Sequence, residues 1–181
     1  MQEVQQYLDY VQLMTYDFHG AFTERTGHLA NLYNDAVSGE NLSADQAISL
    51  FVAAGVPIEK IVMGAAFYGR GWLGVPEKDH GLGQIAKEGD PVERGYAEIC
   101  RLLEDKDKQY QYYWDDYAKA AYIYNGDSLI TYEDPHALTE KVKYVQTHQM
   151  HGIMFWEYSA DQSFTLLQHI YHEMHRNEAI D

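Results

Sequence analysis

The sequence predicts a parallel α/β fold that is interrupted by an inserted α+β segment. Residues 9–16 and 60–67 are strand-like runs with a helical pattern between them, and this order makes one βαβ unit. The run 60–67 is apolar throughout, which is typical of a parallel strand buried on both faces. A third buried strand is expected at 152–156, after a long stretch in which the pattern changes to that of antiparallel strands.

Capping residues mark the helices of the parallel part. Ser43 and Gln46 form a capping box at the start of the first helix, and Gly55 supplies a left-handed C-cap at its end. Asp134 and Asp161 are expected to cap the helices that precede and follow the last strand. The side chains of the last helix that we expect to face the core are Phe164, Leu167, Ile170 and Met174.

The stretch 73–133 has the pattern of a small α+β insertion. Asp90-Pro91, with Glu93 three residues after Asp90, indicates a helix start. Asn125-Gly126 is a strong hairpin signal, because both residues tolerate a positive φ. The antiparallel strands that we expect are 109–114, 120–124 and 129–132.

Composition excludes several classes of function. The 181 residues fit about one domain, and 28 acidic against 13 basic residues give a formal net charge of −15. This charge repels phosphate groups, so we expect no nucleic-acid partner and no binding to anionic membranes. No apolar run approaches the roughly 18 residues of a membrane span. Cys100 is the only cysteine, which excludes an intrachain disulfide and a cysteine-based zinc site.

Tyrosine is over-represented, with 16 copies. Its flat apolar face and polar tip suit sugar binding, although tyrosines that fill a half-polar β core explain the number equally well. The first residues have neither a basic nor an apolar stretch, so no signal peptide is expected in this chain.

Polar and aromatic side chains follow all three predicted parallel strands. Ligands bind at this edge of parallel α/β folds, so the three strand ends predict one joint site. The residues concerned are Tyr16 and Asp17, Tyr68 and Arg70, and Trp156 and Glu157.

Four motifs, in order along nearly the whole chain, resemble the glycoside hydrolase family 18 chitinases. They are MTYDFHG at 14–20, TGH at 26–28, GAAFYGRGW at 64–72 and GIMFWE at 152–157, and LITYEDP at 129–135 is similar to the family's exit from its insertion domain. The resemblance implies the sixth, seventh and eighth strands of a (β/α)8 TIM barrel. The barrel part would be 1–72 and 134–181, and the chitinase insertion domain would be 73–133.

The resemblance also implies substrate-assisted, retaining hydrolysis of β-1,4-linked N-acetylglucosamine polymers such as chitin, without a cofactor or metal. The acetamido oxygen of the sugar attacks its own anomeric carbon while a glutamic acid protonates the leaving oxygen. Tyr16 would hydrogen-bond the acetamido group, and Asp17 would help to distort the sugar. The substrate-binding residues implied are Met14 beneath the site, Tyr68 and Arg70 on the non-reducing side, Phe22 on the leaving-group side and Trp156 as the floor.

The chain departs from the family in one respect. The Asp-x-x-Asp-x-Asp-x-Glu signature that carries the catalytic acid has no counterpart in the sequence. We therefore expect a chain that supplies substrate-binding residues but does not hydrolyse chitin alone, as part of a secreted protein. The alternatives are a non-catalytic chitinase-like lectin and an interaction module. The edges of the first and last strands lack partners, which predicts a homo-oligomer.

Structural interpretations exist beside these roles. Trp156 could belong to the core, Asp17 could cap a loop, and Arg70 could form a surface ion pair. His169, His172 and His175 recur on the last helix, but no carboxylate or cysteine completes a metal site, so a solvated face is favoured.

Overall fold

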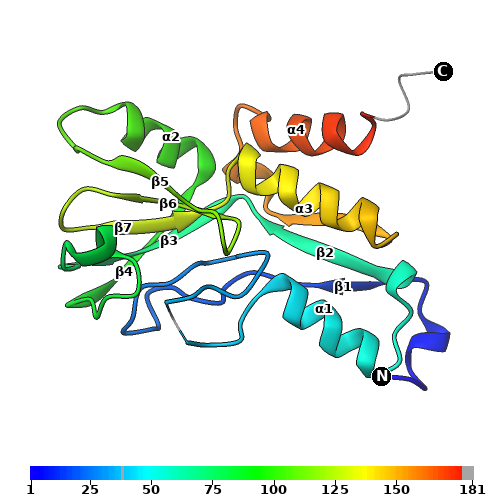
Figure 1. Cartoon of the computed structure of the whole chain (residues 1–181). Helices are drawn as coiled ribbons and strands as arrows, with labels where there is room; N and C mark the ends of the chain where they lie inside the picture. The colour runs from blue at the N-terminus through cyan, green and yellow to red at the C-terminus, as the bar shows by residue number, and fades with distance from the viewer. Residues whose placement is uncertain (38, 177–181) are drawn as a thin grey trace.

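The parallel part of the molecule is a three-stranded sheet in the order β1-β2-β8, and both strand pairs are parallel. The computed structural model describes residues 1–37 and 39–176. Figure 1 shows α1 and α3 beside this sheet, with α4 beyond α3. The elements are β1 (Val11–Leu13), α1 (Ala44–Ala53), β2 (Ile61–Ala66), α3 (Pro135–Thr147), β8 (Gly152–Trp156) and α4 (Thr165–Met174).

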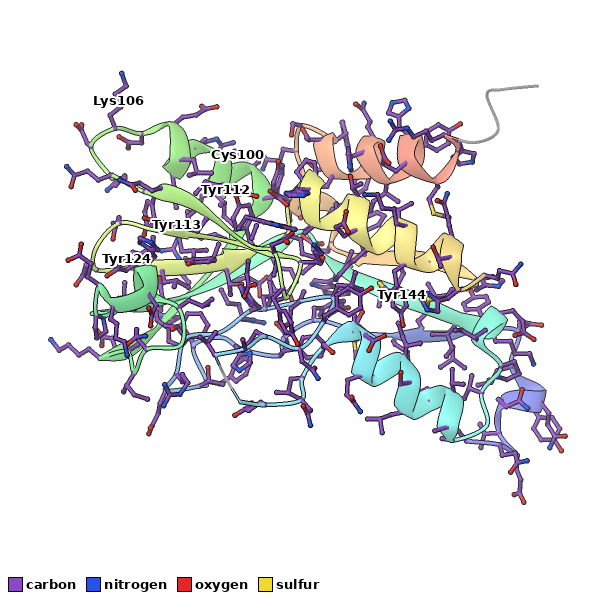
Figure 2. The ribbon with its side chains drawn as sticks, in the orientation of Figure 1. Cys100, Lys106, Tyr112, Tyr113, Tyr124 and Tyr144 are labelled. Atoms are coloured by element: carbon purple, nitrogen blue, oxygen red, sulfur yellow. The ribbon has the colours of Figure 1, made fainter. Side chains whose placement is uncertain are left out.

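The helices cover only one face of this sheet. Because side chains alternate along a strand, Leu13, Met63 and Ile153 share a face, and they pack with Ile48 of α1 and Val145 of α3. Tyr144 of α3 faces α1, where its hydroxyl donates to Asp45 Oδ1 at 2.8 Å (Figure 2). The opposite face borders an open hollow of about 560 Å³, lined by Gln12, Met14, Tyr16, Met154, Phe155 and Trp156.

The second sheet is antiparallel, in the order β4-β3-β7-β6-β5, and only Phe67 separates β2 from β3. Ile99 of α2 packs against Ile123 and Ile130 in the core between this helix and the sheet. The sheet begins at Tyr68, earlier than the predicted boundary at residue 73, and the division into two domains stays a prediction. Its elements are β3 (Tyr68–Leu73), β4 (Glu88–Gly95), α2 (Tyr96–Glu104), β5 (Gln111–Asp115), β6 (Ala120–Tyr124) and β7 (Leu129–Tyr132).

Short 3-10 helices lie in the connections. They are η1 (Gln5–Tyr7), η2 (Ile58–Lys60), η3 (Lys78–Gly81) and η4 (Tyr158–Ala160).

The predicted helix start at Asp90-Pro91 is wrong, because these residues lie in β4 and the helix begins at Tyr96. Asp90 Oδ1 accepts the Val92 N–H at 3.0 Å, and Asp90 Oδ2 accepts from Arg94 at 2.6 Å. This local turn uses the carboxylate that a helix cap would have used. The pairing of β4 with β3 shifts register here, and such an irregularity accommodates a proline in an edge strand.

The hairpin at Asn125-Gly126 is confirmed, because β6 and β7 pair as antiparallel neighbours, and the Asn125 side chain accepts the N–H groups of Asp127 and Ser128 in the connection between them. Two other details differ from the expectation. The last helix begins after Phe164, which is exposed rather than facing the core, although the Asp161 carboxylate still accepts from the first N–H groups of α4. Strand β8 is half-buried, because one of its edges has no neighbour within the described chain.

The other caps are confirmed. Ser43 accepts from Gln46 N at 3.2 Å and Asp134 from Ala137 N at 2.8 Å, and Gly55 has a φ of +90° after the end of α1.

Candidate functional site

Asp17 is the centre of a polar cluster at the carboxyl ends of β1 and β2. It adopts the left-handed region with φ of 59°, a conformation that Asp tolerates better than most residues. The Tyr68 hydroxyl donates to Asp17 Oδ1 at 2.8 Å, and Arg70 donates from Nε to the same oxygen at 2.6 Å. Residues that are far apart in sequence thus fix the carboxylate, so its role is not that of a simple loop cap.

Arg70 joins this carboxylate to a second one. Its Nη2 lies 3.2 Å from Glu93 Oε2, and its guanidinium carbon lies 5.3 Å from the centre of the Tyr68 ring. The hydrogen bond with Asp17 raises the pKa of Arg70, and burial raises the pKa of Tyr68. At physiological pH, Arg70 is therefore a cation and Tyr68 a neutral donor.

Tyr16 lies beside this cluster, above the backbone of β2. Its ring meets the Tyr68 ring edge-on, with 6.1 Å between the centroids. A Cβ atom at Gly64 would lie 2.9 Å from Tyr16 Cε1 and 2.6 Å from the Leu13 carbonyl oxygen, so this position requires glycine. Burial raises the pKa of Tyr16, which keeps the hydroxyl protonated.

Trp156 and Met14 project into the open hollow together with Tyr16. Trp156 is 57% exposed and Met14 is 72% exposed, so neither belongs to the core of the described chain. Phe22 is also exposed and lies near Arg70: a Cβ atom at Gly20 would be 2.5 Å from Arg70 Cδ and 3.0 Å from Phe22 Cε1. The structure thus brings the predicted residues to one side of the molecule, while their roles toward a sugar stay predictions.

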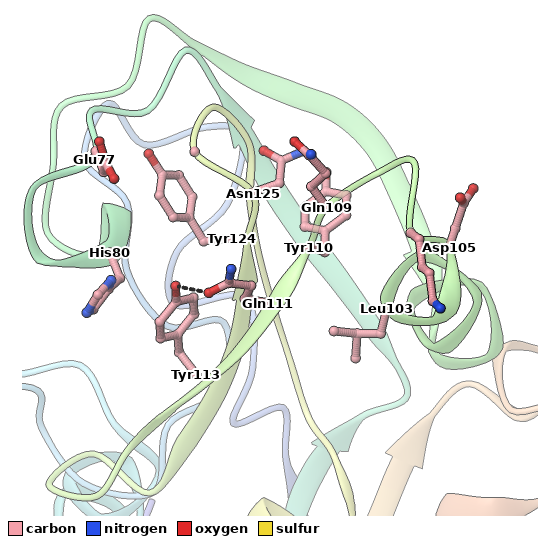
Figure 3. A pocket seen from close by; sticks show the side chains of 12 residues that line it. Glu77, His80, Leu103, Asp105, Gln109, Tyr110, Gln111, Tyr113, Tyr124 and Asn125 are labelled. Atoms are coloured by element: carbon pink, nitrogen blue, oxygen red, sulfur yellow. Dashed lines mark hydrogen bonds between the residues drawn. The ribbon is translucent and has the colours of Figure 1, made fainter.

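A separate hollow of about 560 Å³ lies in the antiparallel part (Figure 3). Its tyrosines are occupied by other contacts. The Tyr113 ring stacks between His80, at 4.6 Å, and Tyr122, at 5.2 Å, and its hydroxyl donates to Gln111. The Tyr124 hydroxyl donates to the Val75 carbonyl at 2.8 Å. The strand ends therefore offer the better aromatic surface for a ligand.

The described residues hold no group of three His, Cys, Asp or Glu side chains placed to bind a metal ion. His169, one of the three recurring histidines, hydrogen-bonds Thr139 at 2.7 Å. None of the helices in residues 1–37 and 39–176 has the length and apolar character needed to cross a bilayer.

Sequence reasoning missed three charged residues near the site. The sequence pattern around Glu93 indicates a helix start, whereas the residue lies in β4 and contacts Arg70. Glu133 and Lys141 form a buried ion pair with 2.6 Å between Oε1 and Nζ, and both contact β2. A usable signal was the lysine within the apolar stripe of the helix at 135–147.

An exposed indole, two tyrosines and a fixed carboxylate–guanidinium pair present both an apolar face and directed hydrogen-bonding groups. Such a combination at the strand ends suits a ligand that has both apolar faces and hydrogen-bonding groups. The model of the glycosyl hydrolases family 18 matches residues 1–161, so the chain belongs to this family. This confirms the family and the TIM-barrel fold class that the sequence predicted.

Individual relatives agree with this assignment. A solved family 18 N-acetylglucosaminidase from Paenibacillus barengoltzii is 41% identical with a TM-score of 0.89, over 95% of this chain and 50% of that one. A Cycas revoluta family 18 chitinase in complex with (GlcNAc)3 is 29% identical with a TM-score of 0.84, over 95% of this chain and 48% of that one. The class V chitinase CHIT5 of Lotus japonicus is 34% identical over 90% of this chain. The chain spans 41% of CHIT5 and about half the length of the solved relatives.

Proposed function

We propose that this chain forms the C-terminal part of a family 18 chitinase and binds oligomers of β-1,4-linked N-acetylglucosamine. The observation that carries the proposal is the fixed Asp17 carboxylate beside Tyr16 and Tyr68, with the exposed Trp156 indole on the same side of the sheet. The net charge of −15 favours a neutral ligand of this kind over an anionic one.

In this proposal the sugar above Trp156 presents its apolar ring face to the indole. The Tyr16 hydroxyl donates to the acetamido group and holds its oxygen in line with the anomeric carbon. Asp17, oriented by Tyr68 and Arg70, accepts from the reacting sugar and favours the distorted ring that the substrate-assisted step requires. Met14 packs beneath the sugar, and Phe22 contacts the leaving-group side.

The glutamic acid that protonates the leaving oxygen has no counterpart in the 181 residues. General acid catalysis contributes typically 10²–10⁴-fold, so the chain by itself would bind but not turn over its ligand. Because a chitin polymer is too large to pass a membrane, we place the activity of the whole protein outside the cell.

Binding of chitotriose to the chain, measured by calorimetry, tests the proposal. One or two stacking contacts predict a dissociation constant of about 1 mM. Trp156→Ala should abolish binding, whereas Tyr171→Ala on the outer side of α4, with a similar exposure of 59%, should not. No binding by a folded chain, or equal binding by both variants, would refute the proposed site.

The same measurement separates the alternatives. A micromolar dissociation constant would favour a lectin. Release of sugar from chito-oligosaccharides above the level of the Trp156→Ala variant would show that the acid is not needed from outside this chain.

A further inference from the structure

A charged pair is buried behind the candidate site. Glu133 follows β7 and Lys141 lies in α3, and their side chains are 3% and 1% exposed, with 2.6 Å between Oε1 and Nζ. A buried ion pair is a poor source of stability, because apolar side chains of similar volume often stabilise a protein as much or more. The pair therefore calls for another explanation, and its contacts with β2 supply one.

The pair lies where the backbone ladder between β1 and β2 ends. These strands are paired only from Val11↔Ile61 to Leu13↔Met63, after which the Thr15 N–H turns back to the Leu13 carbonyl. In β2 the odd-numbered residues bond to the β8 side, as the Phe67 N–H does with the Trp156 carbonyl. Because the N–H and C=O groups of successive residues in a strand point to opposite sides, Gly64 and Ala66 direct theirs toward the side of β1, where the ladder has already ended.

Side chains replace the missing backbone partners. Glu133 Oε2 accepts the Ala66 N–H at 2.5 Å, and Lys141 Nζ donates to the Gly64 carbonyl at 3.2 Å. Thr15 Oγ1 accepts the Gly64 N–H at 2.9 Å and donates to its carbonyl at 2.8 Å. Apolar replacements of the ion pair would leave the Ala66 donor without this acceptor, at a buried position.

These contacts are close in sequence to the predicted sugar-binding residues. Thr15 immediately precedes Tyr16 and Asp17, and Ala66 lies two residues before Tyr68. The Tyr16 ring packs closely against Gly64, because a Cβ atom added at Gly64 would lie only 2.9 Å from Tyr16 Cε1. A shift of the Gly64–Ala66 backbone would therefore move Tyr16 and Tyr68 relative to one another.

We propose that Glu133 and Lys141 are positioning residues, which fix the Gly64–Ala66 backbone of β2 beside the end of β1 and so set the geometry of Tyr16, Asp17 and Tyr68. This inference rests on the proposed function for its link to sugar binding, but the geometric part can be tested without a sugar.

The test replaces the pair by apolar side chains of similar size, Glu133→Leu with Lys141→Met. Leu138→Ala is the control, because Leu138 is buried in the same helix but its apolar side chain makes no hydrogen bond to the backbone of β2. NMR of the sugar-free chain would follow the ring signals of Tyr16 and Tyr68 and the exchange of the Ala66 amide. We expect the ring signals to move, and the amide to exchange about tenfold faster than in the control after correction for global stability.

With chitotriose as the probe, the apolar pair should weaken binding roughly tenfold, the loss that one misplaced hydrogen bond causes, while Leu138→Ala binds as the unchanged chain does. If the apolar pair does not fold, Glu133→Gln with Lys141→Met keeps an acceptor for the Ala66 N–H, while it removes the ion pair and the Gly64 contact, and it should shift the Tyr16 signals in the same direction.

If the ring signals and the exchange rate of the Ala66 amide match those of the control, the inference is overturned, regardless of the result of the chitotriose binding measurement. Shifted signals in a chain that binds no chitotriose would instead refute the proposed function and leave the positioning role supported.

Discussion

Replacement of Lys141 alone by methionine should leave the Glu133 carboxylate buried without a counter-ion. The methionine retains most of the volume of the lysine side chain, so the change removes mainly the charge. Burial raises the pKa of Glu133, and the Lys141 ammonium group opposes this rise, while Asp134 adds to it. Without Lys141, the carboxylate keeps its desolvation and loses its counter-ion, so its pKa in the folded chain rises further.

Breaking one partner of a buried pair costs about 3–5 kcal/mol. In a chain of this size each kcal/mol lowers Tm by about 2–4 °C, which gives a fall of roughly 6–20 °C at neutral pH. The sign of the pH dependence follows from linkage. A carboxyl whose pKa is higher in the folded than in the unfolded state binds protons more tightly when folded, so stability is retained at low pH and lost as pH rises through the folded pKa.

The assay is urea unfolding from about pH 8 to about pH 5, a range above the pKa of an exposed glutamate. Lys141→Met is compared with the double variant Glu133→Gln/Lys141→Met, which cannot ionise at either position, so that their difference isolates Glu133. This difference should shrink as pH falls. A difference in the free energy of unfolding that stays constant over the whole range, or that is absent at pH 8, would refute the idea that the buried carboxylate lacks a counter-ion.

Three further predictions concern the backbone, a helix cap and assembly. Gly64→Ala forces a Cβ atom to within 2.6 Å of the Leu13 carbonyl, so it should lower the free energy of unfolding by about 1–3 kcal/mol and weaken chitotriose binding; unchanged urea curves would contradict this. Asp134→Ala removes the acceptor for Ala137 N–H and for the Tyr112 hydroxyl and should cost about 0.5–2 kcal/mol, with Asp134→Asn as the milder control. The 181-residue chain should self-associate through the free edges of β1 and β8, and light scattering that finds only a 20.9 kDa monomer would contradict this.

The elements that were predicted well are those whose signals are local. The capping roles of Ser43 and Asp134 and the strand at 152–156 follow from neighbouring residues, and the structure confirms them. Asp90-Pro91 carries an equally local signal, yet it failed, because pairing with β3 makes β4 a strand and the carboxylate serves a turn within it.

The residue types of the candidate site were predictable from the sequence, but the buried side chains that contact β2 behind the site were not. The motifs place Tyr16, Asp17 and Tyr68 at strand ends, and the hydrogen bond between Tyr68 and Asp17 agrees with that placement. The Glu133–Lys141 pair joins a strand end to the second turn of a helix, and no periodicity relates the two residues. Their purpose becomes visible only with the early end of the β1–β2 ladder, which is a tertiary feature.

The open face of the parallel sheet sets a limit on what self-association could achieve. Each copy contributes three parallel strands, so two copies provide six, whereas a barrel of this family has eight. A homodimer would cover the edges of β1 and β8 without rebuilding the remaining wall of the cleft around Trp156. We therefore expect self-association to raise the stability of the chain with protein concentration, while its affinity for chitotriose stays unchanged. Affinity that rises together with dimer formation would show that a second copy contributes residues to the site.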